Sequence, residues 1–210
     1  MSLRLIGYRF SVYTWAVRMA LAVVGRDAEY AEVDPFDAGN NAALTGHHPF
    51  GRVPVLWDGD FRIFETGAIL GYLLPPSTDP KTAARARQVS GIIDNYGYLP
   101  LVRQVFSQRV FGPASGEATD EDEVSKGMGL APTVLAALNE IAAEGLVLNG
   151  AGVGVADCHL APMIGYFAKV PEGRDMLAQY PALAAWFGMI SQHASYVTTQ
   201  PDLTAIGDDP

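Results

Sequence analysis

The sequence predicts two domains of different classes: an α/β domain over residues 1–76 and an all-helical domain over residues 82–210. Three observations support this division. Before residue 75, short apolar runs alternate with stretches of helical periodicity. Two of those runs flank Asp58-Gly59, a dipeptide typical of a β-hairpin turn. After PPSTDP at residues 75–80, which has the composition of a linker, only helical patterns follow.

The first elements of the α/β domain are a strand, a helix and a second strand. Leu3 to Tyr8 is short and apolar, as expected of a strand. Thr14 to Val24 places apolar residues on one helical face, and Gly25 can end that helix in a left-handed conformation. A second strand is expected from Ala28 to Val33. Residues 34–46 are ambiguous, and we expect an irregular helix there.

A hairpin and a helix complete this domain. VPVLWDGDFRIF, at residues 53–64, gives two apolar strands around a turn centred on Asp58-Gly59, because both positions tolerate positive φ. A helix is expected from Glu65 to Leu74, where Pro75-Pro76 stops it. The predicted order of elements is therefore βαβαββα.

Four helices are expected in the second domain. The first runs from Lys81 to Phe111 and contains Gly97 and Pro100, and the missing proline N–H predicts a kink. The second begins at Thr119, which forms a potential capping box with Asp122. The expected ranges of the last three are Thr119 to Glu144, Ala156 to Lys169 and Pro181 to His193.

Composition restricts the classes of function. The 210 residues carry a net charge of −9, which disfavours contact with nucleic-acid phosphates. The single cysteine, Cys158, excludes an internal disulfide and suits a reducing compartment. The sequence contains no signal-peptide pattern and no apolar run of the roughly 18 residues that a membrane span needs. We therefore expect a cytoplasmic protein without a nucleic-acid or membrane partner.

Four stretches of the chain carry a recognisable combination of residues. They are SVYTWAVRMAL at residues 11–21, HPFGRVPVL at 48–56, ETGAILGYL at 65–73 and PALAAWFGMI at 181–190. In order and spacing they resemble the cytosolic glutathione transferases of serine type, as in the bacterial, phi and zeta-like classes. The resemblance implies a thioredoxin-like first domain, glutathione as co-substrate, no metal ion and a homodimer. One departure is Gly154, which stands where the family has a Ser or Thr cap before Asp157.

Glu65 and Thr66 stand at a predicted helix start, where unpaired N–H groups and the helix dipole favour an anion. The Thr66 hydroxyl can bind a carboxylate, and Glu65 can pair with an ammonium. Both groups belong to the γ-glutamyl end of glutathione, which the family binds at this position. The alternative is an ordinary first helical turn.

Pro54 stands at the start of a predicted strand, where it cannot donate to a neighbouring strand. This indicates either an edge strand or a cis Val53-Pro54 bond. The resemblance implies the cis form, with the Val53 backbone holding the cysteinyl part of glutathione. It also implies that Arg52 meets the glycyl carboxylate, against the alternative of a solvated surface charge.

Ser11 is the candidate catalytic residue. A free thiol with a pKa of about 8.5 is mostly protonated at neutral pH, and a hydroxyl donor at a helix N-terminus favours the thiolate. The serine-type classes show a similar spacing from the thiol-binding serine into the first helix. Ser11 could instead be only a helix cap, and Tyr8, Tyr13 or Thr14 could face the sulfur.

Five aromatic or apolar residues are candidates for the second-substrate site: Tyr13, Tyr96, Tyr98, Leu99 and Phe106. The last four lie around the predicted kink, a region that faces the glutathione sulfur in the family. Core packing or a dimer surface is the alternative interpretation.

The function implied by the resemblance is conjugation of glutathione to a small hydrophobic electrophile. One alternative is a zeta-like cis–trans isomerase of maleylacetoacetate type, although Val12 and Tyr13 replace the small Ser-Cys pair of that class. The other is a non-catalytic binding or interaction module. The joint presence of Ser11, Pro54 and the Glu65-Thr66 pair disfavours such a module, because a scaffold has no need of all of them.

Overall fold

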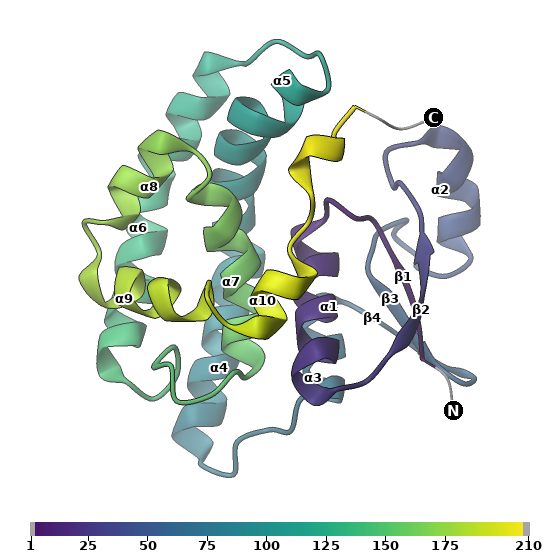
Figure 1. Ribbon diagram of the computed structural model, residues 1–210, viewed down its shortest axis with the longest axis horizontal. Helices are drawn as coiled ribbons and strands as arrows, with labels where there is room; N and C mark the ends of the chain where they lie inside the picture. Colours follow the sequence, from purple (N-terminus) through teal and green to yellow (C-terminus); the bar gives the residue numbers. More distant parts are fainter. Residues whose placement is uncertain (1–2, 208–210) are drawn as a thin grey trace.

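The computed structural model describes residues 3–207, apart from the side chains of residues 38 and 41–43. Residues 1–2 and 208–210, at the outer ends of the two expected domains, lie outside the described residues. Within the described range, an α/β unit is followed by a run of helices (Figure 1).

A four-stranded mixed sheet forms the centre of the first unit. Its strands are β1 (Leu3–Gly7), β2 (Ala28–Glu32), β3 (Val55–Asp58) and β4 (Phe61–Phe64). Their spatial order is β2-β1-β3-β4, with β2 parallel to β1 and with β3 antiparallel to both of its neighbours. Because β3 is a central strand, the edge-strand explanation for Pro54 is wrong.

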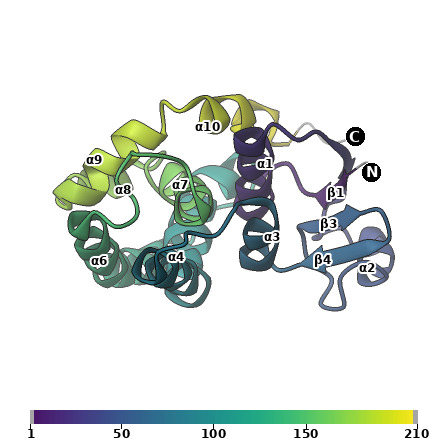
Figure 2. The same cartoon turned by 90° about the horizontal axis from the view of Figure 1, so that it is seen from below.

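Three helices cover this sheet and complete the predicted βαβαββα order. They are α1 (Val12–Val24), α2 (Ala38–Thr45) and α3 (Thr66–Leu73). Figure 2 shows α1 and α3 on one face and α2 on the other. Gly25 ends α1 with a φ of 63°, a left-handed conformation that glycine adopts without steric cost. Trp15 and Met19 of α1 are fully buried and belong to the main hydrophobic core.

The hairpin turn lies one residue later than predicted. Asp58 pairs with Phe61 at the end of the β3–β4 ladder, so the two loop residues are Gly59 and Asp60. Gly59 has a φ of 60°, whereas Asp60 has no positive φ. A two-residue loop with glycine in the first position needs only one such residue, and the sequence alone did not separate this loop from one centred on Asp58-Gly59.

The remaining residues form the helical part of the molecule. Its elements are α4 (Pro80–Ile92), η1 (Ile93–Phe111), α5 (Gly112–Ala114), α6 (Glu121–Glu144), α7 (Val155–Phe167), α8 (Pro171–Leu177), α9 (Pro181–Ile190), α10 (Ala194–Thr199) and the short η2 (Leu203–Ala205). Helical structure continues from α4 through Pro100, and η1 has the wider i→i+5 bonding of a π-helix.

Two helix N-termini differ from simple expectation. The capping box at Thr119 is wrong: Asp120 caps α6 by accepting hydrogen bonds from the N–H groups of Asp122 and Glu123. Thr119 instead donates to the carbonyl of Gln108. At α7, Gly154 has no side chain to offer, but the Asp157 carboxylate accepts from its N–H at 3.0 Å.

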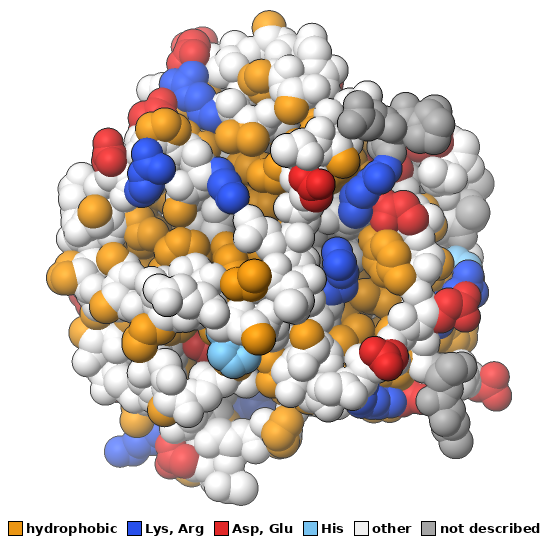
Figure 3. All heavy atoms as spheres, in the orientation of Figure 1, with side chains coloured by type: hydrophobic (Ala, Val, Ile, Leu, Met, Phe, Trp, Pro, Cys, Tyr) orange, Lys and Arg blue, Asp and Glu red, His pale blue; other side chains and the backbone are white. Residues whose placement is uncertain are grey.

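One apolar core extends through both parts of the chain. Trp15 of α1 packs against Tyr166 of α7 and Tyr196 of α10, and its indole N–H donates to Thr199 at 3.1 Å. Figure 3 shows the outer face over these helices, with acidic and basic side chains interspersed among apolar ones. Within the described residues, no helix has the length and apolar character needed to cross a membrane.

Candidate functional site

A cavity of about 570 Å³, here called the first cavity, lies between the α/β unit and η1. The loop before α1, the segment before β3, the start of α3 and the inner face of η1 all contribute to its walls. The residues predicted from sequence that line it are Ser11, Tyr13, Arg52, Val53, Pro54, Glu65, Thr66, Tyr98 and Phe106. The fold therefore brings the proposed glutathione residues and part of the proposed second-substrate set to one place.

The N-terminus of α3 opens into this cavity. Glu65 precedes the helix with a φ of 70° and makes no side-chain capping bond, so the first N–H groups of α3 are not satisfied by a cap. Positive φ is costly for a residue with a Cβ, and such positions cluster at functional sites. Thr66 is buried, and its hydroxyl makes no hydrogen bond to any described residue. This end of α3 can accept a carboxylate.

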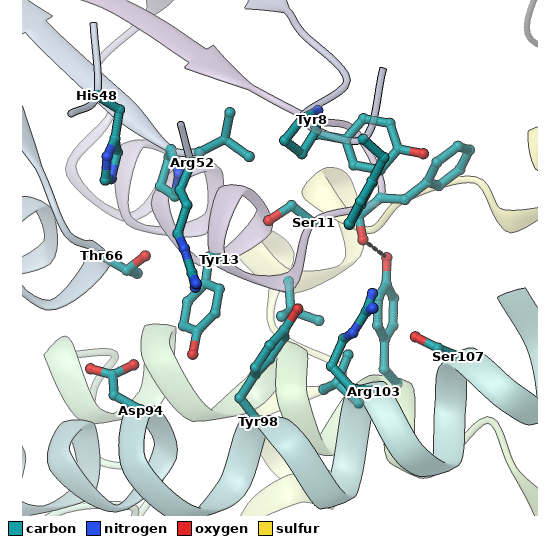
Figure 4. Close-up of a pocket in the computed structure, with 18 of the residues that line it drawn as sticks. Tyr8, Ser11, Tyr13, His48, Arg52, Thr66, Asp94, Tyr98, Arg103 and Ser107 are labelled. Atoms are coloured by element: carbon teal, nitrogen blue, oxygen red, sulfur yellow. Dashed lines mark hydrogen bonds between the residues drawn. The ribbon is translucent and has the colours of Figure 1, made fainter. Parts of the chain in front are cut away.

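The segment before β3 forms the adjoining wall. The Val53-Pro54 peptide bond is cis, as predicted. Arg52 is exposed, and its side chain extends into the cavity from the side of His48 and Thr66 (Figure 4). It forms no ion pair with the carboxylates of the described residues, so its charge is free to meet an anionic ligand.

Ser11 lies between β1 and α1 at the centre of the cavity wall. It is the N-cap of α1, and its Oγ accepts the Thr14 N–H at 3.2 Å. A serine hydroxyl has one hydrogen to donate besides its acceptor lone pairs. The cap bond therefore leaves the O–H of Ser11 available to a ligand in the cavity.

The three alternative candidates for thiol activation, Tyr8, Tyr13 and Thr14, are less well placed than Ser11 to contact a thiol in the cavity. Thr14 does not line the cavity, because its Oγ1 is buried and accepts the Tyr8 N–H at 3.2 Å. The Tyr8 hydroxyl points away from Ser11 in Figure 4, and burial together with Asp34 raises the pKa of Tyr8 to about 12.

Tyr13 does line the cavity, but its hydroxyl points toward Asp94 of η1 (Figure 4). Burial, followed by the charge of Asp94, raises the pKa of Tyr13 above its usual range. Behind Asp94, the fully buried His159 places Nε2 at 3.1 Å from Oδ1 of Asp94, without hydrogen-bond alignment, and Nδ1 at 3.0 Å from Ser90 Oγ. The Tyr13 hydroxyl therefore lies on the Asp94 side of the cavity and not beside Ser11.

Two of the proposed second-substrate residues lie elsewhere. The side chains of Tyr96 and Leu99 are 67% and 54% exposed and do not line the cavity. Other residues of η1, such as Asp94 and Tyr98, do line the cavity. Tyr96 and Leu99 lie between such residues in the sequence but on a different face of the helix. Sequence spacing identified the helix but did not settle which of its faces meets the cavity.

His48 is a cavity residue that sequence reasoning did not select. It is buried, and its Nδ1 accepts the Phe50 N–H at 3.2 Å, which leaves the proton on Nε2. Nε2 lies 3.9 Å from a Glu65 carboxylate oxygen. Burial lowers the pKa of His48, with Glu65 opposing that effect, so the imidazole is neutral at neutral pH. Its presence in the HPFGRVPVL stretch was a usable signal.

Three polar residues on η1 also line the cavity without having been predicted: Asp94, Arg103 and Ser107. They could not be selected from the sequence, because polar residues at such a spacing are equally typical of a solvent-exposed helix face. Among the described residues, no cluster of three or more His, Cys, Asp or Glu side chains is arranged to hold a metal ion.

The chain matches two sequence families. Residues 1–74 match the family described as "Glutathione S-transferase, N-terminal domain". Residues 121–188 match the one described as "Glutathione S-transferase, C-terminal domain". The chain belongs to the glutathione S-transferase family. The two matches fall on the α/β unit and on helices α6 to α9, and the first cavity is walled mainly by the former and by η1, which lies between them.

Similar glutathione S-transferases include two from Arabidopsis thaliana. Glutathione S-transferase F14 is 27% identical over 89% of this chain and 80% of its own length. Glutathione S-transferase F13 is 25% identical over 97% of both chains. Among solved structures, glutathione transferase F7 from Populus trichocarpa aligns with a TM-score of 0.80 at 24% identity, covering 94% of this chain and 97% of that one. Glutathione S-transferase I from maize, in complex with an atrazine glutathione conjugate, aligns with a TM-score of 0.79 at 23% identity over 99% of each chain.

Proposed function

We propose that this glutathione S-transferase conjugates the thiolate of glutathione to a small hydrophobic electrophile. The observation that carries the proposal is the convergence of Ser11, the cis Val53-Pro54 bond and the open N-terminus of α3 on one cavity. A non-catalytic module has no need of this combination.

Glutathione is placed along the wall formed by α3 and the segment before β3. Its γ-glutamyl carboxylate meets the α3 N–H groups and the Thr66 hydroxyl, and its ammonium meets Glu65. The cysteinyl backbone pairs with Val53, and the glycyl carboxylate meets Arg52. The sulfur then faces the Ser11 hydroxyl, whose hydrogen bond and adjoining helix N-terminus favour the thiolate.

The electrophile occupies the rest of the cavity, where Tyr13, Tyr98 and Phe106 form an aromatic wall. Attack by sulfur at the electrophilic carbon forms the C–S bond, and the leaving group departs with its electron pair. Water exclusion by the aromatic wall keeps the thiolate poorly solvated and nucleophilic.

The assembly and location follow from the family. We expect a homodimer, and a reducing compartment such as the cytoplasm, in which the single buried Cys158 stays a thiol.

The proposal is tested by following turnover of a neutral chlorodinitrobenzene with glutathione. The expected result is glutathione-dependent release of chloride and formation of the thioether, with Ser11→Ala much slower at neutral pH. Tight glutathione binding without turnover of any activated aryl halide would favour the binding-module alternative.

A further inference from the structure

Arg103 is a cation in the first cavity that the proposed glutathione contacts do not use. Its side chain rises from η1 toward the loop before α1, on the opposite side of Ser11 from Thr66 (Figure 4). Arg52 and Thr66 line only the first cavity. Arg103 lines both this cavity and an adjoining one of about 390 Å³, here called the second cavity. Arg103 therefore lies on the electrophile's side of the sulfur.

The charge of Arg103 is not neutralised within the described part of the chain. No described carboxylate lies within ion-pairing distance of it. Arg85 and Arg109, by contrast, are bound by glutamates. The guanidinium carbon of Arg103 instead lies 5.6 Å from the centroid of the Phe36 ring. A guanidinium held against a ring and without a carboxylate partner can recognise an anion.

Ser107 adds a second polar group beside it. The two residues are four apart on η1, so they share one face of the helix, and both line both cavities. The Ser107 hydroxyl makes no hydrogen bond to any described residue. The rings of Phe10, Phe36 and Phe111 also border both cavities. The site thus combines apolar walls with one cation and one hydroxyl on the same side.

We propose that Arg103, assisted by Ser107, selects electrophiles that carry a carboxylate on an aromatic or apolar body. The inference rests on the proposed function, because it assigns the second substrate of that same site. The rings hold the apolar body, the sulfur at Ser11 attacks the activated carbon, and the guanidinium binds the carboxylate. Asp34 and Glu117 line only the second cavity, and Glu65 and Asp94 line only the first, with Asp94 at the side away from Arg103 (Figure 4). The carboxylate is therefore expected at Arg103, between these two acidic pairs.

This local cation matters because the molecule as a whole is acidic. A net charge of −9 repels an anionic substrate at long range. Without Arg103, the cavity beyond Ser11 would offer a carboxylate aromatic rings and the neutral hydroxyls of Tyr8 and Ser107, which compensate less of its desolvation than a guanidinium does.

The test compares two probes of similar size and shape, one anionic and one neutral: a chlorodinitrobenzoate and the corresponding benzamide. In both, the glutathione thiolate forms a C–S bond at the chlorine-bearing carbon and chloride leaves with the bonding electrons, so no redox partner is needed. The readout is the ratio of kcat/KM for the benzoate to that for the benzamide, measured with saturating glutathione. Comparing this ratio between variants removes the intrinsic difference in reactivity between the two probes.

Arg103→Met keeps the length of the side chain and removes its charge, and Arg103→Lys keeps the charge. The control is Arg174→Met, which removes an exposed arginine of α8 outside both cavities. We expect the ratio to fall roughly fivefold or more in Arg103→Met, to be partly retained in Arg103→Lys, and to equal the wild-type ratio in Arg174→Met. Added salt should lower the wild-type ratio relative to that of Arg103→Met, because both variants share the long-range repulsion that salt screens and only wild type has the Arg103 contact that salt weakens.

An equal ratio in wild type and Arg103→Met would overturn the inference while leaving the proposed function intact. The same holds if Arg103→Met raises the KM for glutathione with an unchanged ratio, because Arg103 would then belong to the glutathione site. If the wild-type protein conjugates neither probe but does conjugate chlorodinitrobenzene, only this inference fails. If it conjugates none of the three, the proposed function fails and this inference fails with it.

Discussion

At the scale of single residues, Ser11 makes one hydrogen bond as a helix cap and can make the proposed one to a thiol without losing it. Its oxygen accepts the Thr14 N–H and so caps α1, while its hydrogen remains free to donate into the cavity. The sequence left helix capping and thiol activation as alternatives. The geometry makes them compatible, because a hydroxyl that is fixed as an acceptor is also oriented as a donor.

The γ-glutamyl end of glutathione is expected to depend on Glu65 and Thr66. Thr66→Ala removes one hydrogen bond to a carboxylate, worth about 1.5–3 kcal/mol, so the Kd for glutathione should rise at least roughly tenfold. Glu65→Ala should also weaken binding, because the ammonium loses its counter-charge. Titration calorimetry measures both effects.

The matched control for this experiment is Thr198→Ala, which removes an exposed hydroxyl on α10 and should leave the Kd unchanged. Wild-type affinity in both Glu65→Ala and Thr66→Ala would show that glutathione is held elsewhere.

Most residues of the proposed glutathione wall could be selected from the sequence because each has a local signature, and they do line the first cavity. Pro54 before a strand and Glu65-Thr66 before a helix are anomalies or caps that a linear pattern reveals. Arg103 and Ser107 have no such signature, because their importance depends on which face of η1 turns inward. Tyr96 and Leu99 were misplaced for the same reason.

At the scale of elements, the N-termini of α3, α6 and α7 differ in how their first N–H groups are capped. α3 begins without a side-chain cap, so its N–H groups face the cavity. α6 is capped by the exposed Asp120. At α7 the N-cap is Gly154, whose N–H donates to the carboxylate of the buried Asp157 in the first turn, and the second oxygen of Asp157 accepts the Trp186 indole N–H at 2.7 Å. What distinguishes α3 is that its uncapped N-terminus borders the first cavity. Sequence patterns located all three helix starts, but they assigned the α6 cap to Thr119 because two adjacent residues there can each act as a cap.

The two aspartates at the starts of α6 and α7 should contribute unequally to stability. Asp120→Ala removes an exposed cap and should cost about 1 kcal/mol of unfolding free energy. Asp157→Ala leaves two donors without their acceptor in the interior, which should cost about 2–4 kcal/mol. Urea unfolding at pH 7 measures both, and an equal or smaller loss in Asp157→Ala would contradict the view that Asp157 ties α7 to α9.

At the scale of the whole molecule, the candidate site belongs to both parts of the chain. Ser11, Val53 and Thr66 come from the α/β unit, whereas the opposite wall comes from η1 and Tyr166 of α7. The Tyr166 hydroxyl donates to the Phe10 carbonyl at 3.0 Å, so α7 supports the loop that carries Ser11. The sequence predicted both parts and their order. It could not predict the cavity between them, because that depends on side chains far apart in the chain.

Because one core joins the two parts, glutathione should stabilise the chain as a single unit. At about 100 times its Kd, a ligand that binds only the folded state adds about 2.7 kcal/mol to the unfolding free energy. Thermal unfolding should therefore shift upward in a single transition, and Thr66→Ala should need more glutathione for the same shift. A second transition that does not respond to glutathione would contradict this.

The expected homodimer has its own test. Sedimentation equilibrium should give twice the chain mass of 22.4 kDa at micromolar concentration. A monomer with full conjugating activity would show that the site is complete within one chain and that the family's assembly is not needed for it.

The central claim is that Ser11 stabilises the glutathione thiolate in the first cavity, and the pKa of bound glutathione tests it most directly. One charge-assisted hydrogen bond contributes about 1.5–3 kcal/mol, which at about 1.36 kcal/mol per unit lowers a thiol pKa of about 8.5 by one to two units. The measurement is a pH titration of the ultraviolet absorbance of the bound thiolate in wild type, Ser11→Ala and Ser11→Thr. We predict a pKa near 7 in wild type, a return toward that of free glutathione in Ser11→Ala, and retention of the shift in Ser11→Thr. Coincident curves for wild type and Ser11→Ala would contradict the claim and leave Ser11 as a helix cap alone.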